Sequence, residues 1–200
     1  KPARDPLGGS AGVPAGRGAD VSEVRIIGGQ WKRSKLPVAD KPGLRPTPDR
    51  VRETLFNWLG QDLDGWHCLD PFAGSGALGF EAASRGAARV VMIEKSARVL
   101  AALHENLQLL HTPKGVEIIR GDALQYLASA KSKFDLIFLD PPYHKGWIER
   151  LAPLLAAVTH EESAVYVEAE YEIDSLGEWH SVRHGKAGEV HFHLMRRLSA

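Results

Sequence analysis

The chain has 200 residues, 44% of them hydrophobic, and its basic and acidic side chains balance to a formal net charge of zero. A chain of this length buries roughly 70% of the surface that it exposes when unfolded, so we expect one core domain with a small extension. The single cysteine, Cys68, excludes an intrachain disulfide, and no apolar stretch is long enough for a membrane span or a signal-peptide core. These features are typical of a cytoplasmic protein, and any signal for nucleic-acid binding must be local.

Two segments precede the main pattern. Residues 1–23 are rich in Gly, Ala, Pro and Ser, a composition that cannot offset the entropy of ordering, and we expect a disordered tail. Residues 24–60 are expected to form a basic arm with a hairpin and a helix. Within 24–52, eight Arg and Lys residues face only Asp40 and Asp49 as acids. This excess of positive charge suits contacts to RNA phosphates and exposed bases, although a solvated basic strand pair would have the same composition.

From residue 49 onward, helices and strands alternate. Apolar residues recur with helical spacing over 50–59. Further helices are expected at 77–85, 96–110 with Ser96 as N-cap, 123–130 and 147–158. Strands are expected at 68–70, 90–94, 116–119, 134–139, 164–168, 182–184 and 190–194. This alternation predicts an α/β fold with a parallel sheet covered by helices on both faces. The last two strands have no helix between them and predict an antiparallel edge.

A glycine-rich turn lies between the first strand and the first helix of this alternation. Gly74, Gly76 and Gly79 match the pattern G-x-G-x-x-G, and Glu94 follows 20 residues after Gly74 at the end of the next strand. Glycines allow a tight turn and a close approach of the backbone to a ligand, and a carboxylate at that position can accept both hydroxyl hydrogens of a ribose. The glycines alone also fit a plain turn. Together with Glu94 they predict a nucleoside cofactor.

The position of Asp70 indicates which nucleoside cofactor the chain binds. It lies directly before the glycines, where its carboxylate would repel a pyrophosphate, so a ligand with a sulfonium and an ammonium group fits better than a dinucleotide. Asp122, after the third strand, can accept a hydrogen bond from an adenine amino group. It can also cap the helix that begins at Ala123, and the two roles are compatible. The predicted cofactor is S-adenosylmethionine.

The fourth strand ends in Asp140-Pro141-Pro142-Tyr143, at the carboxyl edge where open parallel sheets bind ligands. An exocyclic base amine is a poor nucleophile, because its lone pair is delocalised into the ring. The Asp140 side chain and the Pro141 carbonyl can accept its two hydrogens and draw the lone pair toward a methyl donor. Pro142 restricts the backbone of Pro141, and Tyr143 can stack on the base, which is worth roughly 1–3 kcal/mol. We therefore predict direct methyl transfer to an amine of a nucleic-acid base, with catalysis mainly by positioning.

Several segments resemble one known family over nearly the whole chain from Arg25 to Arg197. They are Arg-Ile-Ile-Gly-Gly at 25–29, Leu-Arg-Pro-Thr-Pro-Asp-Arg-Val-Arg-Glu at 44–53, and the segments 69–82 and 140–143. The chain resembles the RsmD family, bacterial methyltransferases that act on guanine N2 in 16S ribosomal RNA. The last two segments occur in many amino-methyltransferases, whereas the second is much more specific to this family.

The resemblance implies a Rossmann-like class I methyltransferase domain over 61–200, with a seven-stranded, mostly parallel sheet and an antiparallel last strand. It implies that S-adenosylmethionine is the cofactor and that the substrate is 16S rRNA in a small-subunit assembly intermediate with ribosomal proteins. The target guanine must leave its stack for its amine to reach the methyl donor. We expect the protein to act as a monomer.

These interpretations assign the site residues as follows. The catalytic residues are Asp140, Pro141, Pro142 and Tyr143. The cofactor contacts are Asp70, Phe72, Ala73, Gly74, Ser75, Gly76, Glu94, Lys95, Asp122, Ala123 and Asp140. The substrate contacts are Arg45, Thr47, Arg50, Arg52, Tyr143 and Lys145. No metal is expected, because His191 and His193 share a strand face without a third ligand at a suitable spacing.

Three other functions remain open at this point. Adenine-N6 methylation of DNA or RNA uses the same motif at Asp140, but the chain has no separate target-recognition domain. An NAD-dependent oxidoreductase fits the glycine pattern, but nothing after the sheet supplies a hydride-transfer base or a substrate domain. A non-catalytic ribosome-assembly binder would not need both Asp140 and Glu94.

Overall fold

The structure, a computed structural model, describes residues 22–143 and 146–198. Residues 1–21 of the expected tail, and Lys145, lie outside the described residues. The strands are β1 Glu23–Arg25, β2 Lys35–Pro37, β3 His67–Asp70, β4 Arg89–Glu94, β5 Val116–Arg120, β6 Phe134–Leu139, β7 Thr159–Ala169, β8 Ser175–Leu176, β9 Trp179–Ala187 and β10 Val190–Arg197. The helices are α1 Asp49–Trp58, α2 Ala77–Ser84, α3 Ala97–Leu109, α4 Ala123–Ser129 and α5 Trp147–Leu151, followed by the 3-10 turns η1 Ala152–Leu154 and η2 Ala156–Val158.

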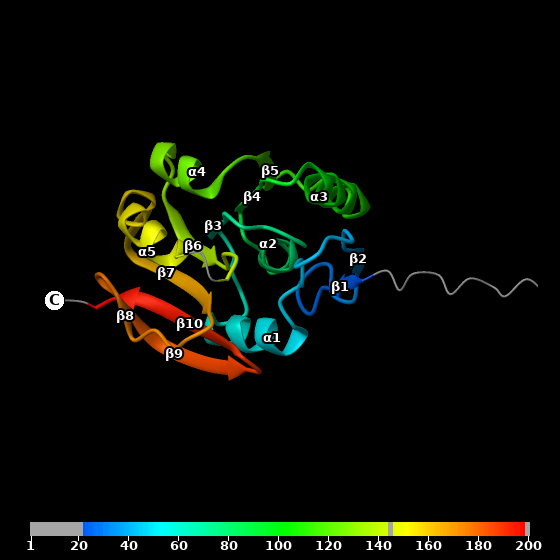
Figure 1. The fold of residues 1–200 in the computed structure, drawn as a ribbon. Coiled ribbons are helices and arrows are strands. Elements are labelled where there is room, and N and C mark those ends of the chain that lie inside the picture. The colour runs from blue at the N-terminus through cyan, green and yellow to red at the C-terminus, as the bar shows by residue number, and fades with distance from the viewer. Residues whose placement is uncertain (1–21, 144–145, 199–200) are drawn as a thin grey trace, which may run out of the picture.

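One large sheet organises the molecule, with strand order β5-β4-β3-β6-β7-β10-β9-β8 (Figure 1). Neighbours from β5 to β7 are parallel, and those from β7 to β8 are antiparallel. The predicted α/β class and antiparallel last strand are confirmed. The sheet has one strand more than the expected seven, because the two-residue strand β8 is added at its edge. The last strand, β10, lies inside the sheet between β7 and β9.

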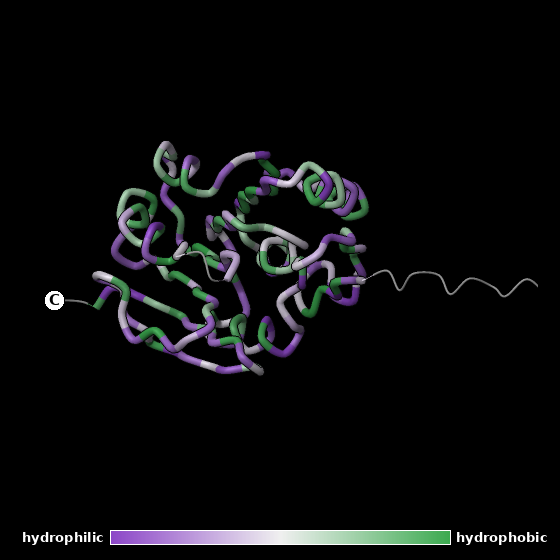
Figure 2. The backbone as a smooth tube through the Cα atoms, in the orientation of Figure 1, coloured by the Kyte–Doolittle hydropathy of each residue, from purple (hydrophilic) through white to green (hydrophobic). Residues whose placement is uncertain are grey.

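Helices cover both faces of the sheet, as the apolar strands predicted. Residues of α1, α2 and α3 share one core cluster with Cys68, Leu136 and Phe138, whereas α4 and α5 share the other with Ile137 and Leu139. Consecutive residues of β6 therefore point to opposite faces and are buried on both. Figure 2 shows the hydrophobic residues along the inner strands. Among the described residues, no helix has the length and apolar character that a membrane span requires.

The expected helix over 147–158 was wrong in its second half. Only Trp147–Leu151 is α-helical, and the chain continues in the 3-10 turns η1 and η2. Pro153 lies in the first of these turns and has no N–H to donate to an α-helical hydrogen bond. The predicted N-cap of α3 is confirmed, since the Ser96 hydroxyl accepts a hydrogen bond from the Val99 amide.

Candidate functional site

The loop 71–76 between β3 and α2 takes its shape from glycines. Gly76 caps α2 with a positive φ of 82°, and a Cβ atom there would lie 2.4 Å from the Phe80 ring. A Cβ atom on Gly79 would lie 2.6 Å from the Met92 sulfur, so that glycine allows α2 to pack closely on β4. A side chain at Gly79 would force α2 away from β4, and one at Gly76 would displace the side chains of Phe80 and Leu103.

Glu94, at the end of β4, is bound directly to this loop. One carboxylate oxygen accepts a hydrogen bond of 3.0 Å from the Gly74 amide. The other accepts from the amides of Lys95 at 3.1 Å and Ser96 at 2.9 Å. The side chain is thus fixed beside the glycines, and because it is half-buried it is also open to a ligand on the loop.

Asp70 is buried at the end of β3, with 1% of its surface exposed. Burial raises the pKa of its carboxyl group to about 7. A hydrogen bond from the Phe72 amide opposes that rise, and the nearby charges of Glu94 and Glu168 add to it. Holding these acids together without a counter-charge costs free energy, and a ligand with positive charge offsets that cost. The residues present therefore fit a cationic nucleoside such as S-adenosylmethionine.

The remaining predicted cofactor contacts lie in the same group of turns. Asp122 caps α4, where its side chain accepts a hydrogen bond of 3.0 Å from the Gln125 amide. This capping role is observed, and the predicted contact with adenine remains a prediction. Lys95 is exposed. The other contacts are buried or half-buried: Phe72, Ala73, Ser75 and Ala123.

The predicted catalytic motif lies at the carboxyl end of β6. Pro141 is buried, Pro142 is exposed, and Tyr143 has 38% of its surface exposed. These three residues line a cavity of about 310 Å³ together with the end of β7 and the start of α5. In the sheet, β6 is the direct neighbour of β3, so the motif lies one strand away from the glycine loop.

The acids of this edge influence one another. Burial raises the pKa of Asp140 well above its ordinary value, and the charge of Glu168, a hydrogen bond to Glu168 and the charge of Asp70 raise it further. Burial also raises the pKa of Tyr143 to about 12, with contributions from Glu168, Asp140 and Glu170. Asp140 therefore shares its immediate surroundings with a second carboxyl group.

The sequence interpretation assigned no role to that second group, Glu168. It is 6% exposed and lines the cavity beside the motif. Its Oε1 atom accepts hydrogen bonds from the Tyr166 hydroxyl at 2.6 Å and the Thr47 hydroxyl at 3.2 Å. A signal was present, because Glu168 follows an apolar strand just as Glu94 does.

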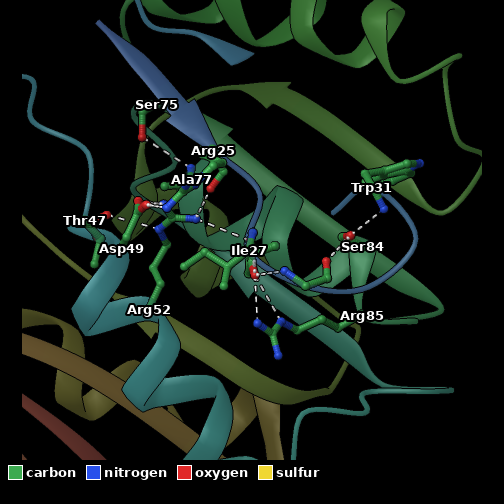
Figure 3. Close-up of polar contacts among 12 residues, drawn as sticks. Arg25, Ile27, Trp31, Thr47, Asp49, Arg52, Ser75, Ala77, Ser84 and Arg85 are labelled. Carbon is green, nitrogen blue, oxygen red and sulfur yellow. Dashed lines mark hydrogen bonds and ion pairs between the residues drawn. The ribbon is translucent and has the colours of Figure 1, made fainter. Parts of the chain in front are cut away.

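A buried ion cluster attaches the N-terminal arm to the sheet domain (Figure 3). Its centre is Glu81 on α2, which is fully buried and accepts hydrogen bonds from the Ile27 amide at 3.0 Å and the Gly28 amide at 3.1 Å. The same carboxylate pairs with Arg52 at 3.3 Å and with Arg85 at 2.9 Å. The arm is therefore attached through its backbone as well as through its side chains.

Arg52 does not fit its predicted role as an RNA contact. It is 1% exposed, and besides Glu81 it binds the carbonyls of Arg25 at 2.9 Å and Thr47 at 3.1 Å and the Asp49 carboxylate at 2.5 Å (Figure 3). The guanidinium group is turned inward because the unpaired Glu81 charge would be costly in the core. Its observed role is to join α1, α2 and the arm.

The other predicted substrate contacts differ in their exposure to solvent. Arg45 and Arg50 are exposed, whereas Thr47 is buried and directed at Glu168. A Cβ atom on Gly74 would lie 3.1 Å from a methyl group of Leu44, so the loop that carries Arg45 lies against the glycine loop. Lys145 lies outside the described residues.

Two residues that are common in metal sites or reactive sites, His193 and Cys68, lie in the interior. His193 is buried, contacts the Val167 carbonyl at 3.0 Å and accepts a hydrogen bond of 2.9 Å from the Ile173 amide. Cys68 is fully buried in β3, and burial raises the pKa of its thiol. Both residues act in packing and hydrogen bonding within the sheet.

Comparison with known proteins identifies a family and several relatives that match most of the chain. The model of the family described as Conserved hypothetical protein 95 matches residues 24–196. Ribosomal RNA small subunit methyltransferase D of Escherichia coli strain K12 is 43% identical over 180 residues, which cover 88% of this chain and 90% of that protein. The protein of the same name from Haemophilus influenzae is 45% identical over 153 residues, covering 74% and 79%.

Solved structures with the same fold include described methyltransferases. A structure described as putative methyltransferase yhhF from Escherichia coli superimposes with a TM-score of 0.79 at 42% identity, covering 90% of this chain and all of that one. A ribosomal protein L11 methylase from Lactobacillus delbrueckii, at 22% identity and a TM-score of 0.63, shares the fold. The chain therefore belongs to the family described as Conserved hypothetical protein 95, the RsmD family of ribosomal RNA small subunit methyltransferases.

Proposed function

We propose that the protein transfers a methyl group from S-adenosylmethionine to the exocyclic N2 of one guanine in 16S ribosomal RNA, within a small-subunit assembly intermediate. The observation that carries this proposal is the position of Asp140 and Pro141 at the end of β6, one strand away from the glycine loop at the end of β3. Acceptors for an amine thus face the same edge as the loop that would hold a methyl donor. The names of the relatives support ribosomal RNA as the substrate.

The bound cofactor supplies an electrophilic methyl group on its sulfonium. Glu94 is placed to accept the ribose hydroxyl hydrogens, since its carboxylate is already fixed against Gly74. Asp70 supplies a buried negative charge for the ammonium group, and Asp122 supplies an acceptor for the adenine amine. The hydrophobic rings of Phe72 and Trp147, 5.4 Å apart edge to face, help to exclude water from this edge.

The protein prepares the amine by holding its hydrogens. The Asp140 side chain and the Pro141 carbonyl accept them, which directs the nitrogen lone pair toward the donor. Tyr143 is exposed enough to stack on the extruded base. The methylated nitrogen is positively charged and therefore acidic, so its proton passes readily to Asp140 or to water.

The test uses small-subunit particles whose 16S rRNA carries no methyl group at the target. Incubation with the protein and labelled S-adenosylmethionine, followed by nuclease digestion and mass spectrometry, should yield N2-methylguanosine at one position. Asp140→Ala should abolish this product, while calorimetry should show S-adenosylhomocysteine affinity within a few-fold of wild type. N6-methyladenosine as the product would instead indicate an adenine methyltransferase, and near-normal turnover by Asp140→Ala would refute the catalytic assignment.

A further inference from the structure

The carboxyl group of Glu168 is held in place at the edge of the cavity beside the catalytic motif. Residues Leu139 and Val167 are paired neighbours in the parallel strands β6 and β7, so Asp140 and Glu168, which follow them, lie at the same level near the ends of adjacent strands. Both side chains point to the face that carries Tyr166 and α1. Glu168 is buried and lines the cavity next to Pro141 and Tyr143, so a base held by the motif would lie close to it.

The orientation of this carboxyl group is defined by two hydroxyl groups. The Tyr166 and Thr47 hydroxyls both donate to Oε1, at 2.6 and 3.2 Å. These bonds fix the plane of the group, and its remaining hydrogen-bonding capacity is shared with Asp140, the residue proposed to hold the amine. Thr47 belongs to the arm segment 44–53, so the arm takes part in fixing an acceptor in the base cavity.

A hydrogen-bond acceptor at this position can distinguish guanine from adenine. On its Watson–Crick edge, guanine presents an N1–H donor directly beside its N2 amine. Adenine presents a lone pair at N1, which a carboxylate repels. Enzymes that extrude a base read this edge by hydrogen bonds. A carboxylate one strand away from the group that holds the amine is thus placed to distinguish the two purines.

We propose that Glu168 selects guanine by accepting a hydrogen bond from its N1–H, while Asp140 and Pro141 hold the N2 amine. This proposal rests on the proposed guanine-N2 activity and adds the residue that recognises the base. Glu168 then contacts the substrate directly, and Thr47 and Tyr166 are positioning residues that act through it.

The contact between the two carboxyl groups is consistent with this assignment. Asp140 and Glu168 are joined by a hydrogen bond, so both groups lie within reach of a single small ligand. The N1 and N2 hydrogens of a bound guanine would take the place of this hydrogen bond. The other ionisable groups facing the pair are Asp70, Tyr143, Tyr166 and Glu170.

The experiment replaces the target guanine by 2-aminopurine, which keeps the amine at C2 but has a lone pair at N1. Particles are reconstituted with ligated 16S rRNA carrying either base at the methylated position. For wild type, kcat/KM should be about 10- to 100-fold higher with guanine, the range expected for one well-placed hydrogen bond. In Glu168→Gln, whose side-chain amide can donate to N1, this preference should fall at least about tenfold or reverse.

The ratio of kcat/KM for guanine to kcat/KM for 2-aminopurine separates base recognition from a merely structural role. A general loss of fold or of cofactor affinity lowers kcat/KM for both bases together and leaves this ratio unchanged. Glu161→Gln, an exposed acid at the other end of β7, is the matched control and should keep the wild-type ratio. S-adenosylhomocysteine affinity and thermal unfolding report whether Glu168→Gln is intact. An unchanged ratio in Glu168→Gln would overturn the inference while the guanine activity stands. Absence of N2-methylguanosine with wild type would instead overturn the proposed function.

Discussion

Three acidic residues, Asp70, Asp140 and Glu168, lie at the carboxyl ends of three adjacent strands, β3, β6 and β7. Burial and mutual repulsion disfavour the charged forms of Asp70 and Asp140 and raise the pKa of both carboxyl groups. The arrangement is useful when a ligand supplies positive charge on one side and N–H donors on the other. Perturbed acids of this kind cluster at functional sites, and here they define both halves of the proposed reaction.

The raised pKa of Asp70 predicts how cofactor affinity depends on pH. Below about 7 the carboxyl group is protonated in the ligand-free protein, whereas the ammonium of the ligand favours the ionised form. Affinity for S-adenosylhomocysteine should therefore be highest near pH 8, where Asp70 is ionised, and fall by up to about tenfold per unit below pH 7. Titration calorimetry at several pH values measures this slope. Asp70→Asn should bind more weakly at pH 8 and lose the slope, and an unaltered slope would exclude Asp70 as its source.

At the scale of elements, the cluster around Glu81 joins α2 to α1 and to the arm. Glu81 holds two arginine side chains and two backbone amides in the core, so its loss leaves buried donors and charges without a partner. Because Arg52 also fixes the Thr47 carbonyl, the cluster indirectly positions the Thr47 hydroxyl at Glu168. Stability and the proposed recognition of the base are thus linked through the arm.

Glu81→Leu should lower the free energy of unfolding by about 3–5 kcal/mol, the usual cost of leaving a buried charge unpaired. Urea denaturation monitored by tryptophan fluorescence measures this change. The control Glu53→Gln, on the exposed face of α1, should remain within about 0.5 kcal/mol of wild type. A Glu81→Leu protein as stable as the control would show that the cluster contributes nothing to the attachment of the arm.

Across the whole molecule, zero net charge conceals a separation of signs. Asp70, Glu94, Asp140 and Glu168 lie near one another at the carboxyl edge of the sheet, whereas Arg45 and Arg50 lie exposed on the arm. Phosphates bound by these arginines would keep the RNA backbone away from the acidic cavity, which receives only the extruded base.

Arg45→Glu with Arg50→Glu should weaken binding to small-subunit particles, and the dependence of the binding constant on salt should become shallower as phosphate contacts are lost. Filter binding at several salt concentrations measures both effects. Lys114→Glu with Lys131→Glu, which reverses two exposed charges outside the arm, is the control for net charge. Equal binding and equal salt dependence for the arm variant and wild type would remove the arm from the RNA interface.

Local signals in the sequence determined the alternation of strands and helices, the glycine turn, the Ser96 cap and the position of Asp140 after β6. These features depend on residues within a few positions of one another, whose backbone preferences and periodicity can be read directly. Only the tertiary structure decided that Arg52 faces the core, that β10 enters the sheet beside β7, and that Glu168 meets Thr47 from 121 positions away. Burial and strand pairing depend on contacts between distant segments. Composition could therefore identify a basic arm, but it could not show which of the arm's charged side chains are buried in ion pairs inside the protein.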